Sequence, residues 1–362
     1  MRFIKHLSFS LCLILFVGSF SLFASCAEEV PFPSLSARAA ALYEVNSDTF
    51  LIAHNAEARM PMASTTKIMT ALAALEVLSP EQKIAFPRCA VGTEGSSAYL
   101  CEGEVLSVED MLYALLLQSA NDVAVALAVL CDGSMEAFSS RMNALAEKYG
   151  CINTHFDNSH GLHSDTHYTT AKDLAIITKH LLQNDLLRTV VSTKTHSITT
   201  SLTKRTFRNH NKLLFGDENV IGVKTGFTKA SGRCLVGALE KDGMTLISVT
   251  LSAPSDWADH KNMWDYALSG YEYRTVLEKG AYSSTFPVVG ALIPYLGVTN
   301  DREIKLFMKK SDPDPILVPI VFSVQTAPIK EGDTVGKLVL MQNGKEIASV
   351  PLRATHTLPQ LS

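Results

Sequence analysis

Residues 60–72 read MPMASTTKIMTAL and open a strong helical pattern over residues 63–78. The pattern is apolar nearly all round, which predicts a helix buried in a large core. Ser64 and Lys67 stand at its start, and residues i and i+3 share a helix face, so the two side chains can meet in one pocket. An apolar setting near another cation lowers the pKa of a lysine and lets it act as a base.

The Ser-x-x-Lys spacing alone is a weak signal. Residues 201–204, SLTK, repeat it in a polar segment without a buried helix. A serine at a helix start is also a common N-cap. The spacing therefore needs support from the rest of the chain.

A second motif, Ser119-Ala120-Asn121, lies between apolar helices expected over residues 111–117 and 122–130. Buried polar groups need partners, so these side chains face each other or a cleft. The alternative is a helix break with local capping.

A third motif, Lys224-Thr225-Gly226, stands at the end of a strand expected over residues 220–224. The lysine and threonine can offer a cation and a hydroxyl to a carboxylate, and glycine lets a substrate backbone approach closely. The alternative is a simple turn at the strand end.

The remaining pattern predicts an α/β (α+β) fold in which an antiparallel or mixed sheet packs with helices. A hairpin is expected over residues 39–55 around a turn at 46–48. The other expected helices cover residues 135–149, 171–182 and 260–269, and the other strands cover 234–239 and 244–251.

The C-terminal part has a different pattern. Gly270 and Gly280 bracket an expected linker, and short strands with Pro and Gly between them follow, which indicates a small β-rich domain. The apolar run 288–296 is too short to span a bilayer. The expected divisions are 1–27, 28–276 and 277–362, and the expected strands are 304–308, 316–324, 335–340 and 347–352.

Residues 1–27 are typical of a secretory signal peptide. Arg2 and Lys5 precede an apolar stretch over residues 7–23, and Ser25 and Ala27 fit a cleavage site after Ala27. The chain is therefore expected to be exported across the cytoplasmic membrane, to the cell wall or periplasm. A retained membrane anchor and a lipoprotein signal with its lipid on the cysteine at position 26 are the alternatives.

Composition excludes some classes of protein. Charged residues make up 19% of the chain, the formal net charge is -4, and no basic run suggests nucleic acid. Seven cysteines show no zinc spacing, and two of them fall in the leader. Cys89–Cys101 and Cys131–Cys151 could be disulfides in an oxidising compartment, or all five remaining cysteines, with Cys234, could be free thiols.

The three motifs, in this order, resemble the set shared by penicillin-binding proteins and class A β-lactamases. The chain is similar in particular to the low-molecular-mass serine D-alanyl-D-alanine carboxypeptidases, over nearly all of its length after the leader. This resemblance implies a β-lactamase-like catalytic domain followed by a small β domain. The matching stretches are 60–72, 118–122 (QSAND), 158–162 (NSHGL), 209–214 (NHNKLL), 222–228 (GVKTGFT) and, in the β domain, 327–333 (APIKEGD).

The resemblance implies roles for the motif residues. Ser64 would attack the carbonyl between the last two D-alanines of a peptidoglycan stem peptide, Lys67 would take its proton, and Ser119 would relay a proton to the leaving amine. β-Lactam antibiotics would acylate the same serine, and neither a metal nor a cofactor is expected. The implied substrate-binding residues are Asn121 for the substrate amide, Lys224 for positive charge, Thr225 and Thr228 for the carboxylate, Gly226, and Phe227, whose N–H would join that of Ser64 in an oxyanion hole.

The chain also departs from the family. Some relatives place an arginine downstream of Lys-Thr-Gly to bind the substrate carboxylate, and residues 256–260, DWADH, offer none. Peripheral membrane association stays open, but residues 358–362 cannot form the amphipathic C-terminal helix of many relatives. His160 as part of a Ser-His-Asp triad, a β-lactamase, a DD-endopeptidase and an inert wall-binding protein are the alternatives.

Overall fold

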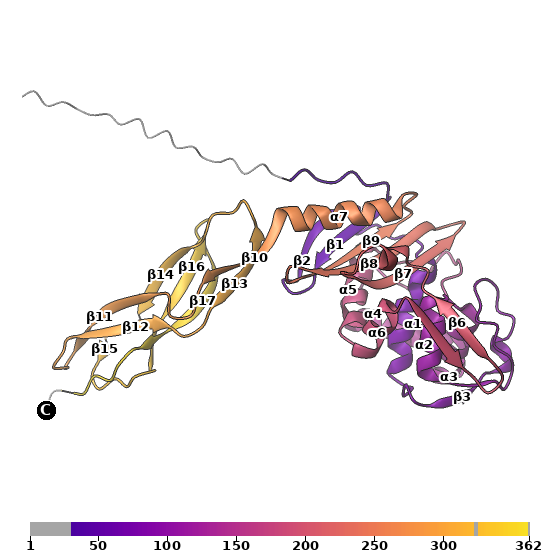
Figure 1. Cartoon of the computed structure of the whole chain (residues 1–362), viewed down its shortest axis with the longest axis horizontal. Coiled ribbons are helices and arrows are strands. Elements are labelled where there is room, and N and C mark those ends of the chain that lie inside the picture. Colours follow the sequence, from indigo (N-terminus) through magenta and orange to yellow (C-terminus); the bar gives the residue numbers. More distant parts are fainter. Residues whose placement is uncertain (1–29, 322–324, 361–362) are drawn as a thin grey trace, which may run out of the picture.

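A computed structural model describes residues 30–321 and 325–360 of the chain. Figure 1 shows two bodies along one long axis, an N-terminal body of helices around a sheet and a C-terminal body of strands. The leader expected over residues 1–27 lies outside the described residues.

The N-terminal body is organised around a sheet in the order β2-β1-β9-β8-β7, with every neighbouring pair antiparallel. The expected hairpin over residues 39–55 is confirmed, because β1 pairs with β2, and a second hairpin joins β8 to β9 through a turn at residues 241–243. The strands are β1 Ala39–Glu44, β2 Thr49–His54, β7 Val220–Thr228, β8 Gly232–Lys241 and β9 Met244–Leu251.

Helices cover both faces of this sheet. Figure 1 shows α7 Asp256–Gly270 on one face and the other helices on the opposite face. Along β1, Ala39 and Ala41 pack into the core of the larger helical layer, and Ala40 and Leu42 into the core beneath α7. Successive strand side chains point to opposite faces, so a strand covered on both sides is apolar throughout.

The larger layer contains α1 to α6. Ser107 caps the start of α2, since its Oγ accepts a hydrogen bond from the Asp110 N–H at 3.0 Å. The helices are α1 Lys67–Leu75, α2 Val108–Leu117, α3 Asn121–Asp132, α4 Met135–Lys148, α5 Ala171–Leu182 and α6 Asp185–Ser192. The short elements around them are η2 Arg88–Ala90, η3 Lys212–Phe215, β3 Lys83–Ala85, β4 Val105–Ser107, β5 Thr195–Thr199 and β6 Lys204–Arg208.

The helix predicted over residues 63–78 is shorter than expected. Residues Ala63–Thr66 form a 3₁₀ turn, η1, and α1 ends at Leu75. The Thr65 and Thr66 hydroxyls donate to the carbonyls of Met62 and Ala63 at 2.6 and 2.8 Å. Such local side-chain bonds compete with the regular helical pattern and favour a tight turn.

The strand at the third motif is longer than expected. Lys224-Thr225-Gly226 lies inside β7 rather than at its end, because pairing with β8 continues to Thr228. Cross-strand pairing offsets the low strand preference of the glycine.

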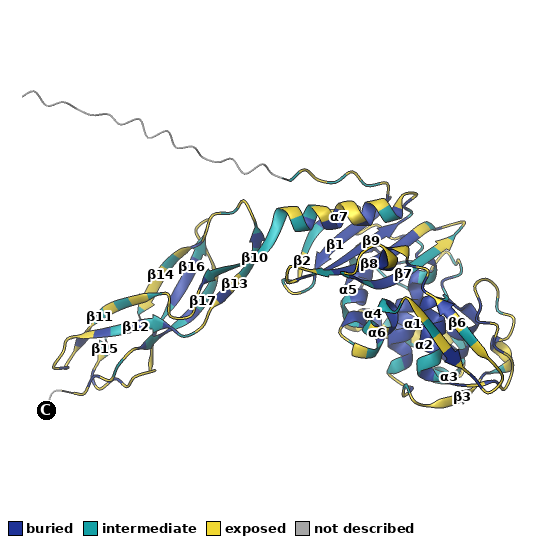
Figure 2. Ribbon diagram, viewed as in Figure 1, coloured by how far each residue is buried: buried dark blue, intermediate teal, exposed yellow. Residues whose placement is uncertain are grey.

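The C-terminal body has its own apolar core (Figure 2). The segment between Gly270 and Gly280 is not a linker, since Tyr271–Leu277 forms β10 and pairs with β13. Its alternating aromatic and charged residues are a strand pattern. β13 Ile304–Lys309 belongs to this two-stranded sheet with β10. A second sheet has the order β14-β16-β17-β12-β11-β15 and consists of β11 Ser283–Val289, β12 Tyr295–Asn300, β14 Ile316–Val321, β15 Gln325–Thr326, β16 Thr334–Gln342 and β17 Lys345–Ala354.

The cysteines at positions 89, 101, 131, 151 and 234 are free thiols in the described part of the chain. Neither suggested disulfide is formed. Within the described ranges, no single helix is long and apolar enough to cross a bilayer, although α3 and α4, bent by 86°, meet those criteria as a pair.

Candidate active site

Ser64 and Lys67 meet as the spacing predicts. Lys67 Nζ lies 2.9 Å from Ser64 Oγ, with Ser64 on η1 and Lys67 at the first position of α1. Ser64 is half-buried, whereas the Lys67 side chain is fully buried. The serine is therefore open to a ligand, and the lysine stands behind it.

Lys67 is held by two carbonyl oxygens. Its Nζ donates to Asn121 Oδ1 at 2.7 Å and to the His160 carbonyl at 2.6 Å. Burial, and then the charge of Lys224, hold the pKa of Lys67 well below its usual value. Once Lys67 has lost its charge, its amine has two protons, and these two bonds use both. Its lone pair can then accept the proton of the Ser64 hydroxyl.

In the second motif, Ser119 lines the pocket and Asn121 binds Lys67. Ser119 has a positive φ of 63° between α2 and α3, and it lines the same pocket as Ser64. Asn121 begins α3, and its Nδ2 donates to the Glu94 carbonyl at 2.6 Å. Both ends of the Asn121 amide are therefore used inside the protein, one by the Glu94 backbone and one by Lys67.

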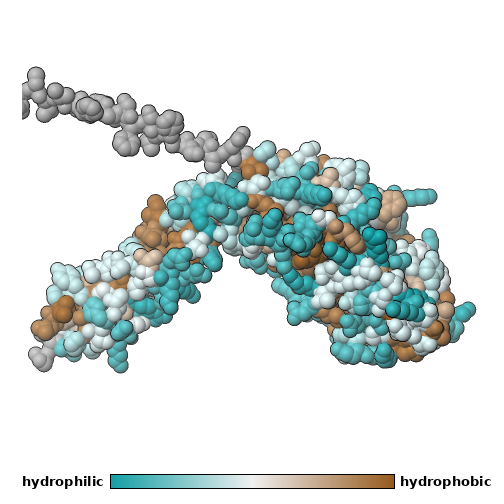
Figure 3. Space-filling view, viewed as in Figure 1, coloured by the Kyte–Doolittle hydropathy of each residue, from teal (hydrophilic) through white to brown (hydrophobic). Residues whose placement is uncertain are grey.

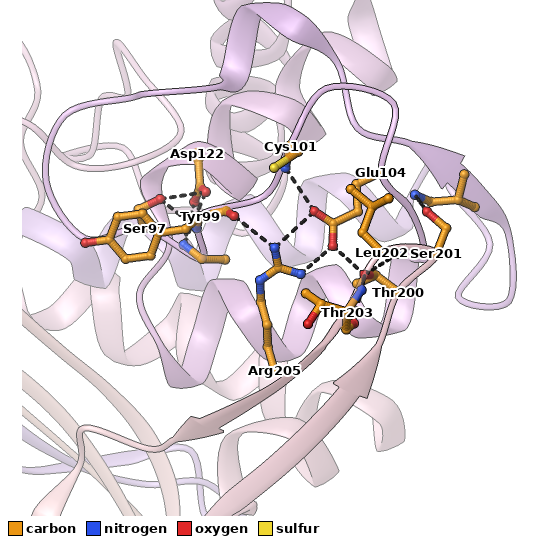
Figure 4. A network of polar contacts seen from close by, with 12 residues as sticks. Ser97, Tyr99, Cys101, Glu104, Asp122, Thr200, Ser201, Leu202, Thr203 and Arg205 are labelled. Carbon is orange, nitrogen blue, oxygen red and sulfur yellow. Dashed lines mark hydrogen bonds and ion pairs between the residues drawn. The ribbon is translucent and has the colours of Figure 1, made fainter.

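The segment that follows Ser96, a residue of the same pocket, is fixed by a polar network. The Asp122 carboxylate accepts hydrogen bonds from Ser97 Oγ at 2.7 Å and from the Ala98 N–H at 3.0 Å. Figure 4 shows this contact beside a second one, in which buried Glu104 binds Arg205 of β6. Together they tie residues 97–104 to α3 and to the β5–β6 hairpin.

The third motif reaches the pocket along β7. Lys224 is buried, which lowers its pKa to about 7, and its Nζ donates to the Thr225 carbonyl at 3.0 Å. A Cβ placed on Gly226 would lie 3.1 Å from the backbone N of Ser64, which is tighter than ordinary contact. Glycine here lets β7 pass directly beside η1.

At the end of β7, Thr228 makes a hydrogen bond within the protein, whereas Phe227 is exposed. Thr228 Oγ1 lies 2.9 Å from Ser231 Oγ in the turn to β8. Phe227 is exposed and lines the pocket.

These elements enclose a pocket of about 380 Å³. It brings together five of the residues that the sequence analysis selected, while Lys67, Asn121, Lys224 and Thr228 do not line it. Its lining consists of the expected Ser64, Ser119, Thr225, Gly226 and Phe227, together with Ser96, His210, Lys212, Arg233, Cys234, Asp256 and Trp257.

Arg233 is a pocket residue that the sequence analysis missed. Its Nη2 donates to Asp256 Oδ1 at 2.8 Å, and its guanidinium lies 5.6 Å from the centre of the Trp257 ring. The Arg233 side chain is 43% exposed and that of Asp256 is 4% exposed. The missed signal was strand register, because Arg233 pairs with Phe227 across β7 and β8.

His160 serves through its backbone. Its carbonyl accepts from Lys67, and its Nδ1 accepts from the Leu162 N–H at 3.1 Å. Burial, and then the charge of Lys67, lower the pKa of the ring to about 4. Gly161, with φ of 88°, lies so close to η1 that a Cβ would meet the Ala63 carbonyl oxygen at 2.0 Å.

Within the described residues, no group of three or more His, Cys, Asp or Glu side chains is arranged to hold a metal ion. The arrangement offers a hydroxyl next to a buried amine, whose pKa is lowered, in an open pocket. Its chemistry is nucleophilic attack by an oxygen whose proton has a nearby acceptor.

Comparison with known proteins agrees with the resemblance found in the sequence. Residues 25–255 match the D-alanyl-D-alanine carboxypeptidase family, and residues 271–360 match the C-terminal domain of penicillin-binding protein 5. The chain belongs to the family of D-alanyl-D-alanine carboxypeptidases.

Three relatives illustrate the match. DacF, a D-alanyl-D-alanine carboxypeptidase of Bacillus subtilis, is 31% identical over 88% of this chain and 85% of its own. Penicillin-binding protein 5 of Haemophilus influenzae superposes with a TM-score of 0.69 at 26% identity, over 91% of this chain and all of its own. The Streptomyces K15 DD-transpeptidase superposes with a TM-score of 0.63 at 31% identity, over 66% of this chain and 98% of its own.

Proposed function

We propose that this chain is a serine-type D-Ala-D-Ala carboxypeptidase that removes the terminal D-alanine from peptidoglycan stem pentapeptides through an acyl-enzyme on Ser64. The observation that carries this is the 2.9 Å contact between the Ser64 hydroxyl and the buried amine of Lys67. Because burial lowers the pKa of Lys67, its amine loses its own proton more readily and can take that of Ser64.

Acylation begins when Lys67 takes the proton of Ser64. Oγ attacks the carbonyl carbon of the penultimate D-alanine, and negative charge develops on the carbonyl oxygen. The backbone N–H groups of Ser64 and Phe227 stabilise that charge. The close approach of Gly226 to Ser64 supports this pairing of η1 with β7.

Collapse of the intermediate breaks the carbon–nitrogen bond. The proton held by Lys67 passes through the Ser119 hydroxyl to the leaving amine, and free D-alanine departs. The charged form of Lys224 keeps this region positive. Water then hydrolyses the ester and returns the proton to Ser64.

Asn121 acts first on Lys67. Its Oδ1 accepts one of the two amine protons, so it aims the lone pair of Lys67 at Ser64. Asn121 is a positioning residue in this scheme, with a substrate contact as a further role.

The terminal carboxylate binds Thr225, Thr228 and Arg233. The bond to Asp256 uses one of the five N–H donors of the Arg233 guanidinium. Asp256 and Trp257 hold the guanidinium in place, and the remaining donors suit a carboxylate. Arg233 thus supplies the cation that residues 256–260 lack.

The setting follows from this chemistry. The enzyme acts on peptidoglycan outside the cytoplasmic membrane, as the leader pattern favours, and β-lactams inhibit it by acylating Ser64.

The test is release of D-alanine from a soluble diacyl-Lys-D-Ala-D-Ala peptide, with the wild type beside Ser64→Ala. We expect release by the wild type alone. If neither folded protein releases D-alanine while penicillin still labels Ser64, the assay points to a DD-endopeptidase that needs cross-linked wall. Absence of both activities identifies an inert wall-binding protein, and rapid turnover of penicillin identifies a β-lactamase.

A further inference from the structure

The end of the C-terminal body farthest from the catalytic pocket carries exposed apolar side chains. The hairpin of β11 and β12 lies there (Figure 1). Val289, Leu292, Ile293 and Tyr295 around its turn are 58%, 78%, 60% and 59% exposed. We call these four residues the hairpin tip. Figure 3 shows hydrophobic atoms gathered at this end of the molecule.

The sequence around the hairpin tip is free of charge. Residues 281–300 contain no Asp, Glu, Lys, Arg or His. Residues 316–329 contain none either, and they include β15, which pairs with β11 at Val288 and Val289. Two separate charge-free stretches therefore meet at the same end of the body. Solvent-exposed hairpin turns are ordinarily polar.

Two of the tip residues are held outward by their strands. Val288 and Leu296, next to Val289 and Tyr295, are buried in the core of the body. Strand side chains alternate between faces, so Val289 and Tyr295 point away from that core. Leu292 and Ile293 lie in the turn itself and are 78% and 60% exposed. The turn is braced at its base, since the Val288 N–H donates to the Pro294 carbonyl at 2.8 Å and the Ala327 N–H donates to the Val289 carbonyl at 3.0 Å.

We infer that the hairpin tip inserts into the surface of a lipid bilayer. A convex apolar turn suits a fluid hydrocarbon phase, whereas a protein partner would need a matching hollow and a polar rim. The two stretches that meet at the tip contain no charged residue with which to specify such a partner. Tyr295, beside the aliphatic residues, has the amphipathic ring that is favoured at the boundary between headgroups and hydrocarbon.

The contact is expected to be weak and reversible, because few side chains enter the bilayer. It is also expected to be insensitive to salt and to lipid charge, since the driving force is burial of apolar surface. This inference is independent of the proposed reaction.

The test uses the chain from residue 28 onward, which removes the apolar leader and keeps every described residue. Its binding to zwitterionic phosphatidylcholine vesicles is measured by co-sedimentation, beside Leu292→Ser/Ile293→Ser. We expect the double variant to lower the partition coefficient at least about tenfold. Ile152→Ser/Leu202→Ser, which removes equally exposed aliphatic residues from the catalytic body, is expected to leave binding unchanged.

Four results would overturn the inference. The wild type could fail to bind vesicles, or the control pair could lose binding as much as the tip pair. Alternatively, the tip variant could abolish a concentration-dependent dimer seen without lipid, which would make a second copy the occupant. Release of the bound protein by about 0.5 M salt, at which the Debye length is roughly half its physiological value, would assign the contact to charge. Penicillin labelling of every variant confirms that the protein is folded.

Discussion

The chain contains the same four-residue spacing twice, and only one copy has the surroundings for catalysis. Ser64 and Lys67 lie on η1 and α1, where the lysine is fully buried and touches the serine. Ser201 and Lys204 lie at the β5–β6 turn, and both are exposed. Ser201 Oγ accepts from the Val105 N–H at 2.9 Å, and within the described residues no hydrogen bond joins it to Lys204.

The difference shows that the Ser-x-x-Lys spacing can support nucleophilic attack only where the lysine is buried beside the serine. An exposed lysine stays charged and hydrated, so it has no lone pair for a serine proton. The turn of the second copy is fixed for another reason, because Thr200 donates its hydroxyl to buried Glu104, which also binds Arg205 (Figure 4). Five experiments test this comparison, from the largest expected effect to the smallest.

Removing each serine separates the two copies most sharply. Ser64→Ala is expected to lower D-alanine release by at least about 1,000-fold and to abolish covalent labelling by penicillin, because the attacking oxygen is lost. Ser201→Ala is the matched control and should retain wild-type rates. Persistent labelling of Ser64→Ala would remove Ser64 as the nucleophile.

Replacing each lysine tests the base. Lys67→Met keeps an apolar side chain of similar length in the buried site and is expected to slow penicillin acylation about 1,000-fold. Lys204→Met should have no effect on the same stopped-flow measurement. A Lys67→Met enzyme that acylates within tenfold of the wild type would require another base.

Gly161→Ala is expected to disturb the surroundings of Lys67, so that the Ser64–Lys67 pair loses part of what distinguishes it from Ser201 and Lys204. The added Cβ would collide with the Ala63 carbonyl and displace the His160 carbonyl from Lys67. We expect activity to fall about 100-fold. Gly150→Ala has a similar φ of 77° and open space around its Cβ, so it reports the backbone cost alone, about 1 kcal/mol in chemical denaturation. Equal activity of the two variants would contradict this account.

Arg233→Ala tests whether this guanidinium binds the terminal carboxylate of a substrate at Ser64. We expect the KM for the D-Ala-D-Ala peptide to rise about tenfold to 100-fold with a smaller change in kcat, because the terminal carboxylate loses a charge-assisted partner. Arg233→Lys should restore part of the loss. A substrate with a C-terminal amide should bind the wild type and Arg233→Ala alike, and a preference for the wild type would argue against carboxylate recognition.

The pH profile of acylation gives the smallest expected effect. The rate should rise with pH as Lys67 loses its proton, since its neutral form is the base. It should fall again above a pH of about 7, where Lys224 loses its charge. The decline should be several-fold between pH 7 and 9 in stopped-flow acylation. A rate that keeps rising to pH 9 would remove the charged form of Lys224 from the mechanism.

Local sequence determined much of this protein. The three motifs, the hairpin at residues 39–55, the helices α4 and α5 and the strands β13, β14, β16 and β17 follow from periodicity and turn residues, which act between near neighbours. Ser64 and Lys67 could be paired from the sequence because they are three residues apart on one turn.

Only the tertiary structure decided the rest. The carbonyl of His160 on Lys67, the Glu94 contact of Asn121, and Arg233 on Trp257 each join segments distant in sequence, and neither propensity nor spacing encodes such contacts. The preference for Ser64 over Ser201 also lies there. The difference between them is desolvation of the lysine, and desolvation depends on what the whole fold packs around a side chain.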